Sequence, residues 1–273
     1  MTIIVLWYDD QSKAINCASD SRISSGNAIT TDNGPKILPI PVTCWKQDIS
    51  KQWTVAHTHS FGFAFAGSTL SATSTHAIAA ACTQSLAGIG SHPSGAVSLE
   101  AIAKLFRSVG ERNVIEMSSR SNGAAVSSYF FDAFIFGFCP VQKEHQAFVI
   151  VSNMADPMFK MVIGRLQLRR HGFQLLGSGE KEFLKILSEV SRSGKPKSLV
   201  SVLSEMLKRQ ENRSVGGYFQ YGVARQNGFN LCPILNLDDD DRNRTVTFLG
   251  LDVSTVSPVD GYMIGYEAFS PDV

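Results

Sequence analysis

Three residues near the start of the chain could together cleave an amide bond. Thr2 follows the initiator methionine, so removal of Met1 would give one residue both a hydroxyl nucleophile and a free α-amine to act as its base. Asp20 ends a run of small residues, and Lys36 follows sixteen positions later. The pKa of a lysine responds strongly to burial and to neighbouring charge, so Lys36 beside a carboxylate can lower the pKa of the hydroxyl and relay its proton. Asp20 would orient Lys36 and balance its charge.

The composition narrows the classes of function that the chain can have. Its 273 residues suffice for a full core, and its 25 Lys and Arg residues nearly cancel its 24 Asp and Glu residues. We therefore expect no nucleic-acid or membrane partner. The five cysteines lie far apart and form no CxxC pair, which argues against a zinc site or a disulfide framework. No signal-peptide pattern and no apolar run of membrane-spanning length occurs, so the sequence predicts a cytoplasmic protein.

Apolar periodicity predicts groups of strands that are separated by pairs of helices. From the N-terminus, we expect strands at 3–8, 14–19, 36–42 and 53–67, helices at 70–87 and 99–109, strands at 129–138, 146–152, 161–168 and 173–177, helices at 180–190 and 199–209, and strands at 217–224, 229–235 and 245–251. Ser98 is a predicted N-cap, and Lys208 suits the C-terminal end of its helix. Because βαβ alternation is missing, we expect one α+β domain over 1–273, with two packed antiparallel sheets and a helix pair outside each.

Several short motifs carry a resemblance to a known family. An Asp-Ser-Arg motif at 20–22 is followed by Lys36 at the family's spacing. The segment FAFAGSTLSA contains Gly67 at a turn into a helix, and LLGSGEKEF contains Ser178 at the entry to another helix. These motifs resemble those of proteasome β-type subunits, which are N-terminal-nucleophile (Ntn) hydrolases. The strands after residue 225 and their acidic turn favour a bacterial proteasome-like relative.

This resemblance implies a fold, a reaction and a set of roles. The implied fold is a four-layer αββα sandwich, the fold of the Ntn hydrolases. Thr2 would attack an amide carbonyl, Lys36 would lower the pKa of its hydroxyl, and Asp20 would position Lys36. The Gly67 amide would donate to the oxyanion, and Ser178 would tune the Thr2 amine. The family also implies a peptide or protein substrate, self-association into a ring, and no metal or organic cofactor; whether an unfoldase feeds the ring stays open.

Two departures from the family pattern leave other functions open. Where the family has an Asp and a Ser before a Gly-Gly pair, this chain has Asn212 and Val215, with Glu211 and Ser214 adjacent. Standard subunits also lack the segment at 42–58. The candidate supporting residues are Arg22, Asn212 and Ser214. A catalytically silent subunit with an assembly or partner-binding role, and a small-molecule amidase, are therefore the alternatives to a peptidase.

Two further groups could suggest a metal site. His57 and His59 point to the same side of a predicted strand, but no third ligand follows at an informative spacing. The four aspartates at 238–241 lack the alternation and the glycine of a calcium-binding loop. We therefore expect a solvated turn at 238–241 and no bound metal.

Overall fold

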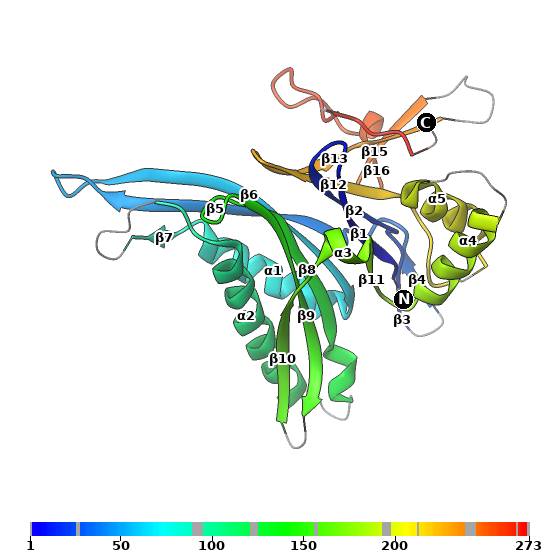
Figure 1. Cartoon of the computed structure of the whole chain (residues 1–273), viewed down its shortest axis with the longest axis horizontal. Helices are drawn as coiled ribbons and strands as arrows, with labels where there is room; N and C mark the ends of the chain where they lie inside the picture. Colours follow the sequence, from blue (N-terminus) through cyan, green and yellow to red (C-terminus); the bar gives the residue numbers. More distant parts are fainter. Residues whose placement is uncertain are drawn as a thin grey trace.

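The computed structural model of the chain describes residues 2–25, 28–88, 95–120, 125–155, 158–192, 198–211, 213–237, 244–265 and 267–271. These ranges contain four helices of eleven or more residues and strands that form four separate sheets (Figure 1). The acidic run at 238–241, for which the sequence predicts a solvated turn, lies outside the described residues.

A five-stranded antiparallel sheet holds the start of the chain. Its strand order is β11-β1-β2-β12-β13. The strands are β1 (Ile4–Asp9), β2 (Ala14–Ser19), β11 (Phe173–Leu176), β12 (Gln220–Arg225) and β13 (Gly228–Cys232). β2 is buried along its whole length, as its run of small and apolar residues predicts. Since Ile4 pairs with Ser19, the start of the chain lies beside the end of β2, where Asp20 follows.

A six-stranded sheet has the order β10-β9-β8-β6-β5-β7. Its strands are β5 (Ile37–Gln47), β6 (Trp53–Gly67), β7 (Leu86–Ala87), β8 (Phe131–Cys139), β9 (Glu144–Ala155) and β10 (Met158–Arg165). β7 pairs in parallel with β5, whereas the other neighbours are antiparallel. Most of β8 is buried, as its nearly continuous apolar sequence predicts.

Two helix pairs pack against these sheets. The helices are α1 (Thr69–Thr83), α2 (Leu99–Ser119), the short α3 (Leu168–His171), α4 (Glu180–Arg192) and α5 (Leu199–Arg209), and the 3₁₀ turns are η1 (Val126–Tyr129) and η2 (Val253–Thr255). Ser98 caps α2 as expected, because its side chain accepts a hydrogen bond from the amide of Ala101. The predicted helix at 70–87 ends at Thr83, since Leu86–Ala87 joins β5 as β7.

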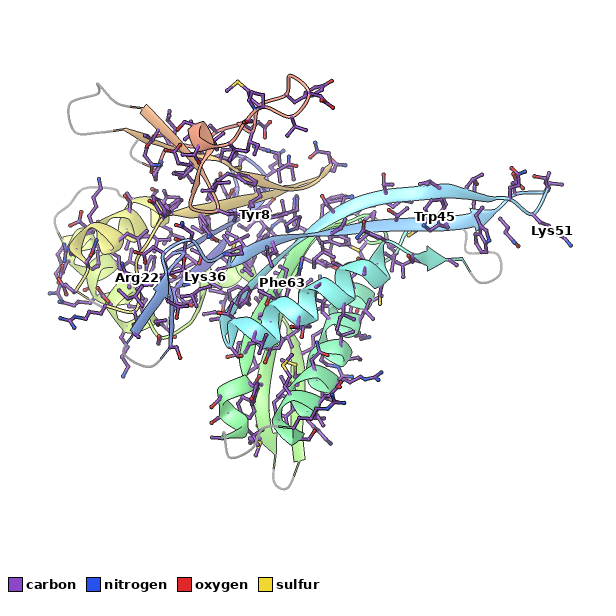
Figure 2. All side chains as sticks on the ribbon, turned by 180° about the vertical axis from the view of Figure 1, so that it is seen from behind. Tyr8, Arg22, Lys36, Trp45, Lys51 and Phe63 are labelled. Carbon is purple, nitrogen blue, oxygen red and sulfur yellow. The ribbon has the colours of Figure 1, made fainter. Side chains whose placement is uncertain are left out.

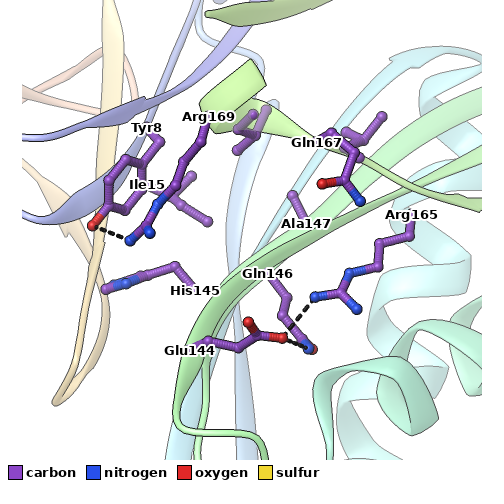
Figure 3. Close-up of a pocket in the computed structure, with 11 residues that line it drawn as sticks. Tyr8, Ile15, Glu144, His145, Gln146, Ala147, Arg165, Gln167 and Arg169 are labelled. Atoms are coloured by element: carbon purple, nitrogen blue, oxygen red, sulfur yellow. Dashed lines mark hydrogen bonds and ion pairs between the residues drawn. The ribbon is translucent and has the colours of Figure 1, made fainter. Parts of the chain in front are cut away.

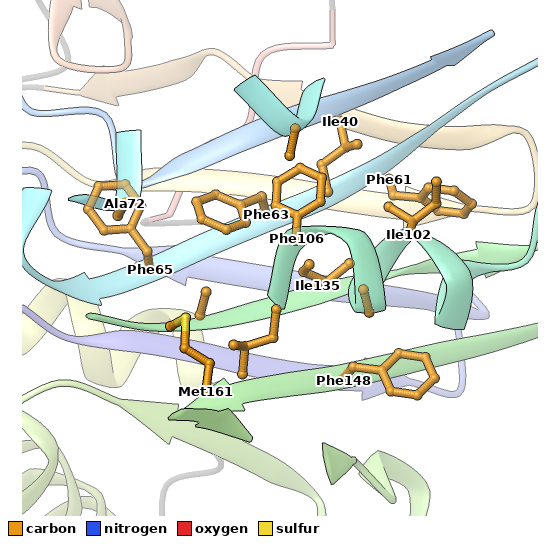
Figure 4. Close-up of a cluster of buried hydrophobic side chains, with 14 of the residues drawn as sticks. Ile40, Phe61, Phe63, Phe65, Ala72, Ile102, Phe106, Ile135, Phe148 and Met161 are labelled. Carbon is orange, nitrogen blue, oxygen red and sulfur yellow. The ribbon is translucent and has the colours of Figure 1, made fainter. Parts of the chain in front are cut away.

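Three apolar clusters hold the molecule together. The first lies between the six-stranded sheet and the pair α1 and α2, where the rings of Phe63 and Phe106 meet at 5.4 Å between centroids (Figure 4). The second joins the five-stranded sheet to α4 and α5. The third contains residues of both large sheets, including Leu6 and Phe134, so these sheets contact each other directly.

The expected four-layer αββα sandwich of two antiparallel sheets is wrong. The six-stranded sheet curls into a half-barrel, and β7 adds a parallel pair to it. The apolar cluster between the two large sheets contains none of the described residues of β10. Only part of the curled sheet therefore faces the five-stranded sheet. Two small sheets lie outside both large ones: β14 (Ile234–Leu237), β15 (Arg244–Phe248) and β16 (Leu251–Asp252) form one, and β3 (Ile23–Ser25) and β4 (Ala28–Thr31) form the other. Long twisted strands favour this curling over flat stacked layers.

The segment at 42–58 forms a β-hairpin arm that projects from the body of the molecule. β5 and β6 stay paired as far as Gln47 and Trp53, with a register shift after Cys44. Figure 2 shows Lys51 at the tip of the arm and Lys36 in the body of the molecule. Ile49 is fully exposed at this tip.

Candidate active site

Thr2 lies two residues before the start of β1, where the Gly-Ser-Gly turn at 177–179 packs against its backbone. The amide of Gly179 donates a hydrogen bond to the Thr2 carbonyl oxygen at 3.2 Å. Gly177 has a φ of 102°, and a Cβ atom at this position would overlap the same carbonyl oxygen. Thr2 itself is 6% exposed. The first glycine of the motif is therefore required by backbone conformation and by close approach.

Asp20 and Lys36 form a buried ion pair behind Thr2. The Lys36 Nζ lies 2.8 Å from Asp20 Oδ1, and the exposed fractions of the two side chains are 2% and 0%. The amide of Ile3 donates to the same Oδ1 at 3.0 Å, while the amide of Gly216 donates to Oδ2 at 3.1 Å. One carboxylate oxygen thus joins the lysine to the backbone of the residue after Thr2. The spacing of sixteen residues brings the pair together because Asp20 directly follows β2 and Lys36 directly precedes β5.

Burial shifts both members of this pair toward their neutral forms. Burial raises the pKa of the Asp20 carboxyl, and the attraction of Lys36 and the hydrogen bonds to the carboxylate oppose this rise. Burial likewise lowers the pKa of Lys36, and Asp20 opposes this change. A lysine with a lowered pKa can take up and release a proton more readily near neutral pH than an exposed one.

Arg22 holds the loop at 213–217, whose Gly216 amide binds Asp20. Its guanidinium contacts Asp32 at 2.6 Å and donates to the carbonyl oxygen of Arg213 at 2.9 Å. The amide of Arg22 also donates to the carbonyl oxygen of Gly216 at 2.9 Å. Because the amide of Gly216 in turn donates to Asp20, Arg22 helps to position the Asp20 carboxylate through the loop at 213–217.

The sequence departs from the pattern that the resemblance implies at Asn212 and Val215. Asn212 lies outside the described residues. Ser214 is buried, and Val215 belongs to the apolar cluster beneath α4 and α5. A Cβ atom at Gly179 would lie 3.1 Å from Val215 Cγ2, so the valine side chain packs beside the turn that covers Thr2. Val215 therefore contributes packing to the site and no polar group.

A cavity of about 420 Å³ opens beside Thr2. It is lined by Thr2, Ala66, Gly67, Phe130, Phe131, Asp132, Ser152, Gly177 and Ser178. Three of the predicted site residues, Thr2, Gly67 and Ser178, therefore meet at one cavity. Gly67 has a φ of 105°, and a Cβ atom there would lie 2.6 Å from the carbonyl oxygen of Phe130. Only glycine fits this close approach between β6 and the residue before β8.

Sequence reasoning missed Asp132 and Ser152 in this cavity. Asp132 is the one charged residue within the apolar sequence FFDAFIF, and this interruption was the available signal. Ser152 lies near the end of β9, where its hydroxyl donates to the carbonyl oxygen of Phe131 at 2.7 Å. A serine in a strand gives no comparable signal in the sequence.

A second cavity, of about 140 Å³, lies away from Thr2 (Figure 3). Arg165 contacts Glu144 at 2.6 Å, and Arg169 stacks over the ring of Tyr8 at 4.5 Å from its centroid. The residues that line it include no serine, threonine or cysteine. Both cations are thus already engaged, and the one hydroxyl among the lining residues, that of Tyr8, accepts a hydrogen bond from Arg169 at 2.9 Å. The cavity beside Thr2 is therefore the candidate active site.

His57 and His59 do lie side by side on β6, as their spacing predicts. Their ring centroids are 6.0 Å apart, and His59 Nε2 lies 2.9 Å from the carbonyl oxygen of Phe138. The described residues contain no group of three or more His, Cys, Asp or Glu side chains that could hold a metal ion. The pair therefore packs as stacked rings.

A comparison of the chain with protein-family models and with curated proteins finds no match. Within the described part of the chain, none of the helices combines the length and the apolar character that crossing a bilayer requires.

Proposed function

We propose that this protein is a threonine-type amide hydrolase whose nucleophile is Thr2 after removal of Met1. The observation that carries this proposal is the buried pair of Asp20 and Lys36, which is hydrogen-bonded to the backbone next to Thr2. A fully buried ion pair costs desolvation energy, so its location behind a threonine at a cavity favours a chemical role over a merely stabilising one.

The proposed reaction passes through an acyl-enzyme. Thr2 Oγ attacks the amide carbonyl, and the Thr2 amine takes the hydroxyl proton and then gives it to the leaving amine. Lys36 lowers the pKa of the hydroxyl. The amide of Gly67 stabilises the oxyanion, a contribution of about 3 kcal/mol in enzymes from which one such donor has been removed. Ser178 tunes the amine, and water then hydrolyses the ester to regenerate Thr2.

The resemblance to proteasome β-type subunits supports peptide substrates and a ring of several copies in the cytoplasm, fed by an unfoldase. The exposed apolar residues Ile49, Trp53 and Val55 on the β5–β6 arm support self-association. A native mass that is a multiple of the 29.7 kDa chain is expected, and a monomer at working concentration would contradict the ring.

A second candidate is a catalytically silent subunit with the same architecture. The observation that favours it is Val215, which brings an apolar side chain to a place where the family has a polar one. The silent subunit would keep the Asp20–Lys36 pair as a structural element and bind a partner.

Hydrolysis assays separate these candidates. The protein without Met1 is expected to cleave peptide amides, and Thr2→Ala is expected to lower kcat/KM on the order of 10³-fold or more because the nucleophile is lost. Thr2→Ser keeps a hydroxyl and an amine, so it is the matched control and should retain measurable activity. Cleavage of short acyl amides but not peptides would favour the amidase. An inactive wild-type chain whose Met1 is removed would favour the silent subunit.

A further inference from the structure

The cavity beside Thr2 contains one charged side chain, Asp132. None of the other eight residues that line it carries a charge. Asp132 precedes the buried core of β8 and is half-buried. Its place opposite Ala66, next to Gly67 in the β6–β8 register, brings it close to the proposed oxyanion donor.

The carboxylate of Asp132 is held by the backbone of β9. Oδ1 accepts a hydrogen bond from the amide of Ser152 at 2.8 Å. Among the described residues, no lysine, arginine or histidine forms an ion pair with this carboxylate. Burial raises the pKa of the Asp132 carboxyl, and the hydrogen bond from the Ser152 amide opposes this rise.

The hydrogen bond to Ser152 does not require a negative charge. An asparagine oxygen could accept from the same amide, without the cost of desolvating a carboxylate. A cation that entered the cavity would offset this cost and would find an acceptor that has no lysine, arginine or histidine partner among the described residues. The charge of Asp132 therefore favours a cationic group in the cavity.

The walls of the cavity suit the stem of a long basic side chain. Phe130 and Phe131 line it, and the ring of Phe130 is held in place by stacking on Phe159 at 4.9 Å. Lysine and arginine bury their methylene groups against apolar surface and place their charge at the tip. An apolar wall that ends at one carboxylate matches this pattern.

We propose that the substrate carries a lysine or arginine side chain next to the amide bond that is cleaved, and that Asp132 binds its cationic group. This inference rests on the proposed function of Thr2. Asp132 would act as a specificity residue that contacts substrate, with no part in bond cleavage.

The test compares peptides that differ in one charge. Arginine and its neutral isostere citrulline are placed either directly before or directly after the scissile bond, and kcat/KM is measured for each. At one of these two positions, arginine is expected to be favoured by about 10- to 100-fold, the range of a hydrogen bond to a charged group. In Asp132→Asn the ratio should fall close to one, because the oxygen that accepts from Ser152 remains and only the charge is lost. Ser152→Ala alters the same cavity without changing its charge, so this matched control should keep the preference.

Binding without catalysis separates this inference from the proposed function. The dissociation constants of N-acetyl-arginine amide and N-acetyl-citrulline amide are measured by calorimetry for wild type and Asp132→Asn. An arginine preference that disappears in Asp132→Asn would support the inference even in a chain that hydrolyses nothing. Hydrolysis by Thr2 with equal use of arginine and citrulline at both positions would overturn the inference and leave the proposed function standing.

Discussion

Lys36 and Asp20 are the residues on which the proposed chemistry depends most. Each is almost fully buried, and each neutralises the other. Removal of one partner from such a pair leaves a buried charge without compensation, which costs about 3–5 kcal/mol. A change to either residue should therefore affect both the stability of the fold and the proposed catalysis.

Lys36→Met is expected to lower the free energy of unfolding by about 3–5 kcal/mol and to lower kcat/KM by about 10²-fold or more. Denaturant unfolding and peptide hydrolysis measure the two effects. The double variant Asp20→Asn/Lys36→Met removes both charges, so it should recover part of the stability and none of the activity.

Lys104→Met provides the control for this experiment. Lys104 pairs with Glu100 on the exposed face of α2, and its side chain is 61% exposed. An exposed pair of this kind contributes about 0–1 kcal/mol, so this variant should behave like wild type. Equal stability of the Lys36 and Lys104 variants would contradict the account of the buried pair.

Sequence analysis predicted the site residues that belong to a recognisable motif and missed the site residues that belong to none. The Asp-Ser-Arg motif and the distance to Lys36 led to an ion pair that the structure contains. Asp132 and Ser152 come to the cavity through the pairing of β8 and β9, which no local pattern encodes. Asn212 lies outside the described residues, so its predicted supporting role stays a prediction.

Among the elements, the turn between β11 and α4 fixes the position of Thr2. Gly177→Ala would place a methyl group against the Thr2 carbonyl oxygen at a φ of 102°. We expect this variant to lose about 10- to 100-fold in kcat/KM, because small displacements of a nucleophile are costly. Steady-state kinetics and thermal unfolding measure the effects.

Gly172→Ala separates the clash from backbone strain. Gly172 also has a positive φ, of 72°, but a Cβ atom there would meet nothing within 4 Å. Both variants should share a destabilisation of about 1 kcal/mol from the backbone conformation. If Gly172→Ala reduced activity as much as Gly177→Ala, the packing of the turn on Thr2 would not be the cause.

Helix α2 is longer than the apolar periodicity of the sequence predicts. The helix predicted at 99–109 continues to Ser119, since Gly110 does not end it. A Cβ atom at Gly110 would lie 2.8 Å from Met161 Sδ, so this glycine allows α2 to approach β10 closely. A glycine selected for tertiary packing looks like a helix stop in the sequence.

For the whole molecule, the sequence predicted the order of the longer strands and helices but neither the short elements β3, β4, β7 and α3 nor the shape of the sheets. Apolar runs indicate which strands are buried, and the three apolar clusters agree with them. Long strands accumulate twist and a bulge increases it locally, so β5 and β6, with their register shift after Cys44, favour a curled sheet. The parallel pairing of Leu86–Ala87 with β5 is also a long-range event that residue patterns do not show.

In the proposed reaction, Thr2 becomes the N-terminal residue and acts as the nucleophile. The most direct measurement is the intact mass of the purified full chain before and after incubation with a peptide epoxyketone. This probe reacts only where the hydroxyl and the free amine belong to one N-terminal residue. We predict a chain that has lost Met1 and gains a single adduct, and no adduct on Thr2→Ala. A chain that retains Met1 and gains no adduct would contradict the claim and leave the silent subunit as the better account.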